Sequence, residues 1–361
     1  MDKFAFLIHP LDMRDIIRYE PMAANKRSEL IRKMVEWMPP HLASHITGIR
    51  SITGREIEGY FIVVPFLPDQ FISLPQEKVC EKIINAGKIA EEKGARILGL
   101  GGFTSVVGNA GYVVANELDI PVTSGNSYTV ASALEGTFYA AEKMNLDIES
   151  CNITIVGATG AIGSVCAQII AEKVPKLTLI ARNSVRLKEI AEIIRRRTTC
   201  DIKTTVNLEE GIPLSDIIIT ATSASGEIIT SDMIKPGSLI CDVALPHDVG
   251  REVAQQRPDV LVFEGGVIQV PGEVNFNYDF GYPPGISLAC MAETMILTLE
   301  ERFEPFSLGR RLKPEKITEI QKMADKHGFK LAGLRSFDRP VTPEQFARVK
   351  KYIQESKTIA R

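Results

Sequence analysis

The sequence lacks several features that mark particular classes of protein. Its six cysteines lie at positions 80, 151, 166, 200, 241 and 290, and no two of them form a C-x-x-C pair. This scatter argues against a zinc site and against a disulfide framework. No apolar run approaches the about 20 residues that a membrane-spanning helix needs, and the apolar stretch after Met1 is too short for a signal peptide. We therefore expect a cytoplasmic protein without a transmembrane segment.

Excess charge, internal repeats and low-complexity segments are also absent. The 361 residues carry a net charge of −3, which gives no sign of a nucleic-acid partner. Hydrophobic residues make up 45% of the chain and charged residues 24%, as in ordinary globular proteins. A chain of this length can form two domains.

Strand-like apolar runs recur regularly from about residue 148 onward. Helical or loop spacers separate them, and Pro236-Gly237 predicts a turn before the fifth run. Six such strands would complete a doubly wound parallel sheet of the Rossmann type. The six predicted strands are Ile153–Val156, Leu177–Ile180, Ile202–Val206, Asp216–Thr220, Ser238–Val243 and Val260–Phe263.

The whole pattern predicts a two-domain α/β fold. The first 130 residues alternate strand-like and helical segments, such as the helical periodicity of residues 76–93. After Gly285 the pattern is mostly helical, with helices expected at 287–302 and 313–327. We predict an N-terminal α/β substrate domain, a connecting helix, a Rossmann domain and a C-terminal helical segment, with the boundaries 1–130, 131–147, 148–281 and 282–361.

Three glycines follow the first of the six strands in the spacing G-x-x-G-x-x-G. Residues 153–156 lead into them, and residues 164–173 are helical in pattern. Backbone N–H groups at such a helix N-terminus can face a pyrophosphate, because glycine leaves no Cβ in the way. Strand, glycines and helix in this order predict a dinucleotide site, formed by Gly157, Ala158, Thr159, Gly160, Ala161, Ile162 and Gly163.

The residues after the second strand indicate which dinucleotide binds. An NAD site usually carries Asp or Glu there, to bind the ribose hydroxyls, and this chain has no acid at that point. It has Arg182, Asn183 and Arg186, which suit a 2′-phosphate. We predict NADPH, while the alternative is that these arginines are ordinary solvated residues of a loop. We also assign Thr222 and Gly265 to the cofactor site.

Cys290 is the candidate nucleophile. The segment Pro283-Pro-Gly-Ile-Ser287 ends in a good helix N-cap, which would place Cys290 in the first turn of a helix. There the helix dipole and the unpaired N–H groups would lower the pKa of the thiol. The alternative is a small buried residue on an apolar helix face, and the pattern leaves both interpretations open. For Cys151, Cys166 and Cys241, in or beside predicted core elements, a structural role is favoured.

Eight short segments form an ordered set along the chain. They are Leu98-Gly-Leu-Gly-Gly-Phe-Thr-Ser105, Thr123-Ser-Gly-Asn-Ser-Tyr-Thr129, Val156-Gly-Ala-Thr-Gly-Ala-Ile-Gly163, Leu179-Ile-Ala-Arg-Asn183, Glu264-Gly-Gly-Val267, Ala289-Cys-Met-Ala-Glu293, Leu308-Gly-Arg310 and His327-Gly-Phe329. In this order they resemble the long-chain acyl-[acyl-carrier-protein] reductases best known from cyanobacteria. The resemblance begins at Phe4-Ala-Phe-Leu-Ile-His9 and covers close to the whole chain.

The resemblance implies NADPH-dependent reduction of long-chain fatty acyl thioesters to aldehydes, with Cys290 as the acyl-accepting residue. It implies acyl carrier protein or coenzyme A as the carrier, and an enzyme downstream that consumes the aldehyde. It also implies a Mg²⁺ dependence, for which no ligands are identifiable. The chain departs from the family in continuing from Phe329 to Arg361 and in its own Pro-Pro-Gly-Ile-Ser segment. These departures leave the acyl length and the carrier open.

Chemistry through an acyl-cysteine needs hydrogen-bond donors for the developing oxyanion. The N–H groups at the start of the Cys290 helix are candidates, and Ser287 belongs to the same helix start. Thr104, Ser105 and Asn126 lie in polar turns that could reach the site, although such residues are also ordinary turn formers.

Two basic clusters, Arg195–Arg197 and Arg310–Lys313, could dock an acidic carrier protein. The alternative is a solvated helix face, which is favoured for the first cluster. His9 and His247 are candidate proton donors, but no neighbour in sequence supplies an orienting group, and this favours structural roles.

Other classes of function stay open. An enzyme like shikimate dehydrogenase would work through a Lys/Asp pair and need no thiol. One like glutamyl-tRNA reductase would need a nucleophilic cysteine in the N-terminal domain, where Cys80 is the sole candidate. A sensor protein would bind NADPH and catalyse nothing.

Overall fold

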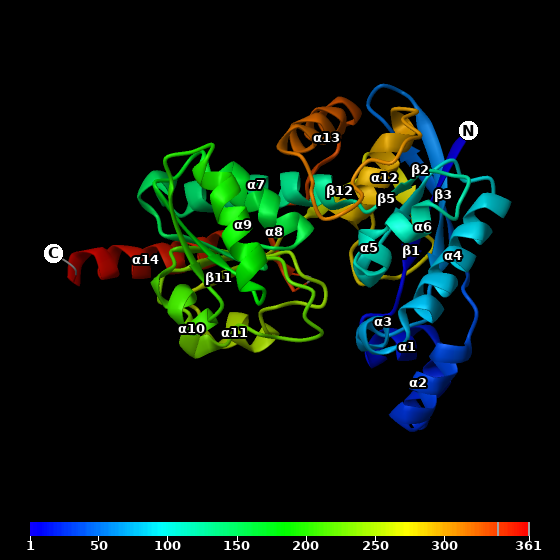
Figure 1. Ribbon diagram of the computed structural model, residues 1–361, viewed down its shortest axis with the longest axis horizontal. Coiled ribbons are helices and arrows are strands. Elements are labelled where there is room, and N and C mark those ends of the chain that lie inside the picture. Colours follow the sequence, from blue (N-terminus) through cyan, green and yellow to red (C-terminus); the bar gives the residue numbers. More distant parts are fainter. Residues whose placement is uncertain (338, 360–361) are drawn as a thin grey trace. The chain divides into compact units, whose positions relative to one another are not determined.

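The computed structural model describes residues 1–337 and 339–359 and divides the chain into two compact units (Figure 1). Unit 1 comprises Met1–Tyr128, Ile268–Arg310 and Glu319–Lys330. Unit 2 comprises Thr129–Val267, Arg311–Thr318 and the chain from Leu331 onward. Both units are built of strands and helices, so the predicted two-domain α/β fold class is confirmed.

Unit 1 is built on a six-stranded mixed sheet in the order β13-β2-β3-β1-β4-β5. Strands β1, β3, β4 and β5 run parallel, and β2 and β13 are antiparallel to their neighbours. The strands are β1 (Asp2–Ile8), β2 (His41–Arg50), β3 (Glu56–Val63), β4 (Leu98–Leu100), β5 (Val122–Thr123) and β13 (Gly272–Asn275).

Helices cover both faces of this sheet. The helices that lie wholly in unit 1 are α1 (Met13–Tyr19), α2 (Ser28–Trp37), α3 (Pro68–Ser73), α4 (Gln76–Glu92), α5 (Val107–Ala110), α6 (Tyr112–Ala115) and α12 (Ala289–Leu299). Alternate residues of a strand face opposite sides. Ala5 and Leu7 of β1 therefore share a core with Val79 and Ile83 of α4, as the periodicity of residues 76–93 predicts. The other face carries Phe6 and receives α12.

Unit 2 is a Rossmann fold with six parallel strands in the order β11-β10-β9-β6-β7-β8. Its strands are β6 (Ile153–Val156), β7 (Lys176–Ile180), β8 (Asp201–Thr205), β9 (Ile217–Thr220), β10 (Leu239–Asp242) and β11 (Leu261–Glu264). All six predicted strands are confirmed within one residue at each end. Their continuous apolar runs reflect burial on both faces of a parallel sheet.

Further helices and short strands complete the chain. The helices are α7 (Asn126–Lys143), α8 (Ala161–Ala171), α9 (Ser184–Arg195), α10 (Leu208–Gly211), α11 (Arg251–Gln256), α13 (Pro314–His327) and α14 (Pro343–Ile359). The short strands are β12 (Val267–Gln269), β14 (Ile286–Leu288), β15 (Lys330–Leu331), β16 (Arg335–Ser336) and β17 (Arg339–Pro340). None of the described helices is long and apolar enough to cross a membrane.

The compact units differ from the predicted boundaries after residue 267. The prediction placed Cys290 in a separate C-terminal helical segment, 282–361, but its helix α12 belongs to unit 1. A Cβ on Gly99 of β4 would lie 2.1 Å from Thr294 Oγ1 of α12, so strand and helix are in direct contact. The apolar face of the sheet that carries Phe6 has to be buried. Helix α12, which is far from β1 in the sequence, packs against this face.

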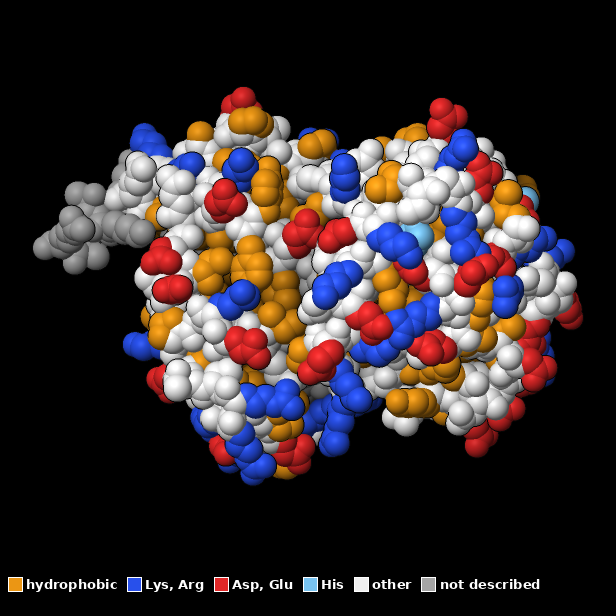
Figure 2. Space-filling model, turned by 90° about the horizontal axis from the view of Figure 1, so that it is seen from above, with side chains coloured by type: hydrophobic (Ala, Val, Ile, Leu, Met, Phe, Trp, Pro, Cys, Tyr) orange, Lys and Arg blue, Asp and Glu red, His pale blue; other side chains and the backbone are white. Residues whose placement is uncertain are grey.

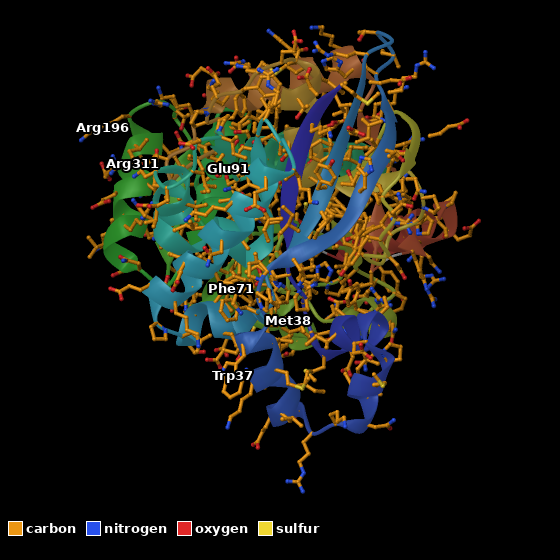
Figure 3. The ribbon with its side chains drawn as sticks, turned by 90° about the vertical axis from the view of Figure 1, so that its right-hand side faces the viewer. Trp37, Met38, Phe71, Glu91, Arg196 and Arg311 are labelled. Atoms are coloured by element: carbon orange, nitrogen blue, oxygen red, sulfur yellow. The ribbon has the colours of Figure 1, made fainter. Side chains whose placement is uncertain are left out.

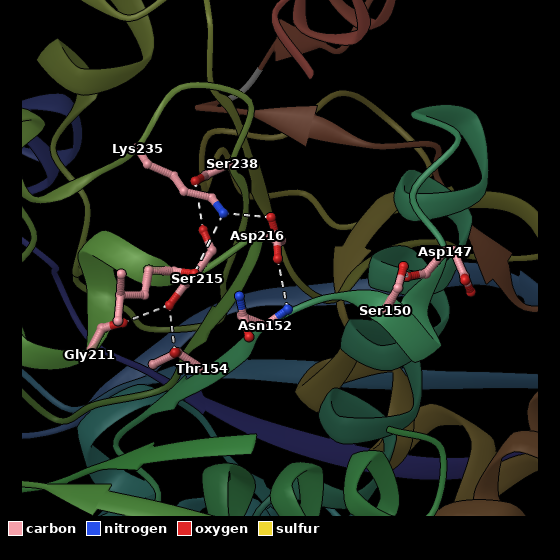
Figure 4. Close-up of polar contacts among 10 residues, drawn as sticks. Asp147, Ser150, Asn152, Thr154, Gly211, Ser215, Asp216, Lys235 and Ser238 are labelled. Atoms are coloured by element: carbon pink, nitrogen blue, oxygen red, sulfur yellow. Dashed lines mark hydrogen bonds and ion pairs between the residues drawn. The ribbon is translucent and has the colours of Figure 1, made fainter. Parts of the chain in front are cut away.

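A polar network joins the amino ends of the unit 2 strands (Figure 4). The Asn152 N–H donates to Asp216 Oδ2 at 2.7 Å, and Lys235 Nζ pairs with Asp216 Oδ1 at 2.6 Å. Thr154 and Ser215 share a hydroxyl hydrogen bond of 2.5 Å. Ligands of open α/β sheets bind at the carboxyl ends of the strands, so this network at the opposite edge is structural.

Candidate active site

Cys290 is the second residue of α12, so its predicted place in the first turn of a helix is correct. The predicted N-cap is wrong: Leu288 holds that position and makes no side-chain cap hydrogen bond. Ser287 lies in β14, fully buried, and its hydroxyl donates to Leu288 O at 3.4 Å. The short strand β14 (Ile286–Leu288) follows the Pro-Pro-Gly turn, where the sequence predicts the helix N-cap, and α12 therefore begins after Ser287.

The environment of the Cys290 sulfur disfavours the thiolate. Of the six cysteines, all of which the structure describes, five are buried and Cys290 is partly exposed. Desolvation of its sulfur, together with the nearby carboxyl group of Glu293, nevertheless raises the pKa of the thiol to about 12. A hydrogen bond from the Met291 backbone acts in the opposite direction and is outweighed. The predicted lowering of the pKa is therefore wrong, because burial exceeds the effect of the helix terminus.

The loop between β5 and α7 lies directly against Cys290. Gly125 has a φ of +73°, and a Cβ there would lie 2.3 Å from Cys290 Cα and 2.4 Å from Cys290 Cβ. Glycine is required at this position both by the positive φ and by the close approach. Sequence reasoning singled out the turn but not Gly125, because the sequence does not show what a glycine packs against.

Glu293 lies one turn after Cys290 in α12 and accepts hydrogen bonds from residues at both ends of this loop. The side chain is fully buried, Thr123 Oγ1 donates to Glu293 Oε1 at 2.5 Å, and the Tyr128 N–H donates to Oε2 at 2.8 Å. The Ser307 hydroxyl also donates to Ser127 Oγ at 2.6 Å, in the same buried network. Burial raises the pKa of Glu293, and these hydrogen bonds oppose the shift. Sequence reasoning missed Glu293 as a functional residue.

The predicted oxyanion donors from polar turns differ in their surroundings. The Thr104 hydroxyl donates to Gly101 O at 2.8 Å and the Ser105 hydroxyl to Gly102 O at 2.8 Å, so both protons are used within their own turn. Asn126 is half-buried and is the first residue of α7, next to Gly125. Asn126 therefore lies next to the residue that packs against Cys290. Thr104 and Ser105 instead make the hydrogen bonds of ordinary turn residues.

Two histidines of unit 1 have structural surroundings. His9 accepts a hydrogen bond from the Phe103 N–H at 3.0 Å and donates to Pro10 O at 3.0 Å, and burial lowers its pKa to about 4. His327 bonds Ser51 Oγ at 2.8 Å and Glu300 Oε1 at 2.8 Å. Ser51 is 3% exposed, so this Ser–His–Glu row is not placed to attack a substrate.

The glycine-rich turn of unit 2 has the geometry that the sequence predicts. Gly157 has a φ of +81°, and a Cβ there would lie 2.4 Å from Ala221 O. A Cβ on Gly163 would lie 2.4 Å from Gly157 O, so this glycine allows α8 to pack closely on the turn. Gly160 is the N-cap of α8. The N–H groups of Ala161, Ile162 and Gly163 form the first turn, where no intrahelical acceptor exists.

The predicted cofactor residues at the junction of β7 and α9 differ in their contacts and exposure. The side chain of Asn183 accepts a hydrogen bond from the Arg186 N–H at 3.0 Å and caps α9. Arg182 is exposed and Arg186 is half-buried, so both side chains are accessible to solvent. No acidic residue stands in residues 181–188.

Asp248 supports the segment that follows β9 and was missed by sequence reasoning. It is fully buried and accepts hydrogen bonds from Thr220 Oγ1 at 2.5 Å and from Thr222 Oγ1 at 2.5 Å. The predicted cofactor residue Thr222 therefore has its hydroxyl proton committed to Asp248. Gly265 is required by packing, since a Cβ there would lie 2.7 Å from Cys241 Sγ.

His247 has carboxylate neighbours that the sequence did not indicate. Its Nδ1 lies 3.6 Å from Asp242 Oδ2 and its Nε2 3.8 Å from Glu264 Oε1. Burial disfavours the cation, but these acids and Asp248 outweigh it and raise the pKa of His247. Within the described part of the chain, no group of three or more His, Cys, Asp or Glu could hold a metal ion.

A family model matches part of this chain, and individual known proteins match most of it. The family model of shikimate / quinate 5-dehydrogenase matches residues 139–264, inside unit 2. A solved structure of shikimate 5-dehydrogenase from Listeria monocytogenes, in complex with shikimate and NAD, is 14% identical, with a TM-score of 0.38. That similarity covers 90% of this chain and 96% of the Listeria chain.

Two relatives match over most of the sequence. The chain is 29% identical over 366 residues to the aminotransferase PigE of Serratia sp., a match that covers 97% of this chain and 42% of PigE. It therefore spans less than half of that relative. It is 30% identical over 307 residues to the long-chain acyl-[acyl-carrier-protein] reductase of Synechococcus elongatus, covering 81% of this chain and 87% of that protein. On this identity over most of both sequences, the chain belongs to the family of that reductase, within the NAD(P)-dependent oxidoreductases.

Proposed function

We propose that this protein reduces long-chain fatty acyl thioesters to aldehydes with NADPH, through an acyl group carried on Cys290. The observation that carries the proposal is the position of Cys290, partly exposed in the first turn of α12 and held against the Gly125 loop. The Synechococcus relative, which is named for the same reaction class, supports it. The scheme covers thioesters of acyl carrier protein and of coenzyme A alike, since the proposed chemistry at sulfur is the same.

The nucleotide turn of unit 2 fits a dinucleotide. A Cβ on Gly157 or Gly163 would collide with backbone oxygen at 2.4 Å, so glycine is needed for the turn itself. The first-turn N–H groups of α8 would hold the pyrophosphate. Arg182 and Arg186 would hold the 2′-phosphate, because guanidinium groups bind phosphate in two-point contacts.

In the first step the Cys290 sulfur attacks the carbonyl carbon of the thioester. A new carbon–sulfur bond forms, the bond to the carrier sulfur breaks, and the proton of the Cys290 thiol leaves with the carrier thiol. One thioester replaces another, so the exchange tethers the acyl group at little cost in free energy. The N–H groups in the first turn of α12 would stabilise the oxyanion of this step.

In the second step the acyl group leaves as an aldehyde. When bound, NADPH supplies a hydride to the acyl carbon. The Cys290 sulfur takes back the electron pair of its carbon–sulfur bond as the aldehyde departs, and one proton from solvent restores the thiol. The Gly125 loop and α12 keep the sulfur in place throughout, because Glu293 holds them together.

Intact-protein mass after mixing with a long-chain acyl-CoA, without NADPH, tests the role of Cys290. We expect an acyl adduct on the wild type and on Cys80→Ala, and none on Cys290→Ala. Cys80 is the matched control, since it is buried in α4 and its thiol pKa is raised by burial. Added NADPH should discharge the adduct as aldehyde. An equal adduct on all three proteins, or none, would remove Cys290 from the mechanism.

The preference for NADPH rests on Arg182 and Arg186. Replacing both by Glu should raise the KM for NADPH at least about tenfold and leave the KM for NADH nearly unchanged, because only NADPH carries the 2′-phosphate. The double variant Arg196→Glu/Arg197→Glu, at the exposed end of α9, is the control. Equal effects on both cofactors would contradict the assignment.

The other classes of function predict different outcomes. An enzyme that works like shikimate dehydrogenase would keep full activity in Cys290→Ala. A sensor would bind NADPH and oxidise none with any thioester. A reductase with its nucleophile at Cys80 would lose the acyl adduct in Cys80→Ala and keep it in Cys290→Ala.

A further inference from the structure

The helices α1 and α2 carry an unusual set of exposed apolar side chains. The side of α2 that faces α1 contributes Ile31 and Val35, which are buried in a small core with Ala23. Another side of α2 carries Leu30, Met34 and Trp37, which are 49%, 53% and 79% exposed. These three residues have the i, i+4, i+7 spacing that places side chains in one row along a helix.

Further apolar side chains are exposed before and after α2 in the chain. Met22 is 71% and Met38 is 41% exposed, and Tyr19, at the end of α1, is also exposed. Figure 3 labels Trp37 and Met38 at one end of unit 1, where α1 and α2 project beyond the sheet, and Figure 1 shows the same projection. We call the residues Tyr19, Met22, Leu30, Met34, Trp37 and Met38 the apolar row. Monomeric proteins rarely leave large groups of apolar side chains exposed unless something covers them.

In the part of the chain that the structure describes, more cations than carboxylates stand without an ion-pair partner beside the apolar row. Lys26, Arg27 and Lys33 are exposed, and among the described residues no ion pair engages them. The acid Glu36 of the same helix is already paired with Lys78 of α4. Glu29 lies in the first turn of α2, where a carboxylate stabilises the helix terminus. The unpaired cations Lys26, Arg27 and Lys33 therefore outnumber the exposed carboxylates Glu20 and Glu29.

We propose that the α1–α2 pair docks this apolar row on an anionic lipid surface. A helix that presents Leu, Met and Trp between basic residues is the kind that lies in the plane of a membrane interface, its apolar side chains among the acyl chains and its bases at anionic headgroups. Trp and Tyr favour that interface because one part of each ring system is apolar and another polar. A second copy of the chain would set the same three cations against each other, so charge favours the lipid surface over self-association.

Trp37 makes the test direct, because it is the single tryptophan of the chain. Full-length protein is titrated with vesicles of phosphatidylcholine containing one fifth phosphatidylglycerol, and with vesicles of phosphatidylcholine alone. We expect a blue shift of the Trp37 emission and co-sedimentation with the anionic vesicles, both weakened by added salt. Leu30→Ser/Met34→Ser should weaken binding at least about tenfold, since two large side chains no longer enter the acyl region.

Two further variants test how much charge, and how much exposed apolar surface elsewhere in the chain, contribute to vesicle binding. Lys33→Glu should reduce binding to anionic vesicles and abolish the preference over neutral ones. Val206→Ser/Leu214→Ser, at apolar residues of unit 2 that are 56% and 63% exposed, is the matched control and should bind as the wild type does. Circular dichroism checks that each variant is folded.

Three results would overturn the proposal. The first is no change of Trp37 emission with either vesicle. The second is unchanged vesicle binding by Leu30→Ser/Met34→Ser. The third is a blue shift that rises with protein concentration in the absence of vesicles, which would assign the apolar row to a second copy of the chain.

Discussion

At the scale of the residue, Cys290 has the position of a nucleophile and the surroundings of a buried thiol. Its place in the first turn of α12 offers backbone N–H groups, while desolvation and Glu293 raise its pKa to about 12. Burial disfavours the charged form, so the thiolate fraction at neutral pH is small. Reactivity of the free protein should therefore follow the rise of that fraction with pH.

Alkylation of Cys290 by iodoacetamide should become about tenfold faster for each pH unit between pH 7 and pH 9, without a plateau. The reason is that a thiol far below its pKa gains thiolate in proportion to the hydroxide concentration. The rate is measured by peptide mass at residue 290. Free cysteine, with a pKa near about 8.5, is the control and should level off above that pH. A plateau for Cys290 below pH 8 would contradict the raised pKa.

At the scale of the element, the carboxylate of Glu293 joins α12 to the loop that leads into α7. It accepts from Thr123 Oγ1 and from the Tyr128 N–H, and all three residues are buried. Buried donors without an acceptor cost free energy, since they have lost water and gained no partner. The loop against Cys290 therefore depends on a side chain one helical turn away.

Glu293→Ala should lower the free energy of unfolding by about 2–4 kcal/mol, because it leaves two buried donors unpaired and a cavity. Glu293→Gln should lose less, since one amide oxygen still accepts. Urea denaturation of both variants measures this, with the exposed Glu29→Ala of α2 as control. Equal stability of Glu293→Ala and the wild type would show that the network does not hold the loop.

At the scale of the whole molecule, the net charge of −3 is small for a chain of 361 residues. Basic and acidic side chains are intermixed on the face in Figure 2, as the net charge of −3 leads one to expect. The two basic clusters differ in their surroundings: Arg195 is engaged by Glu192 at 2.7 Å, while Arg310 and Arg311 are exposed. Figure 3 labels Arg196 and Arg311, one exposed residue of each cluster.

An acidic carrier protein should depend on the second cluster. Arg310→Glu/Arg311→Glu should raise the KM for acyl carrier protein thioesters about tenfold and leave kcat unchanged, because exposed charges act on encounter rather than on chemistry. Arg196→Glu/Arg197→Glu should leave both constants unchanged. Steady-state kinetics at low salt measures the effect. A larger effect of the Arg196 variant would move the carrier to the first cluster.

Much of the fold could be predicted because its signals are local. The strands of unit 2 are apolar runs bounded by turn residues, and the nucleotide turn follows β6 without interruption. Strands that pair with a partner far away in the sequence were missed. An example is β13, which pairs with β2 although more than two hundred residues separate them in the sequence. The prediction of a separate C-terminal segment, 282–361, was wrong for the same reason. No residue near α12 in the sequence indicates that this helix packs on the unit 1 sheet.

The sequence by itself determined the strands of the Rossmann sheet, the glycine-rich turn and the presence of Cys290 in the first turn of a helix, because strand, helix and turn propensities act between neighbouring residues. The tertiary structure alone decided that Gly125 lies against Cys290, that Glu293 and Asp248 are buried acceptors, and that the Cys290 thiol has a raised pKa. These are properties of burial and of contacts between distant segments. Desolvation depends on everything packed around an atom, and no local pattern contains that information.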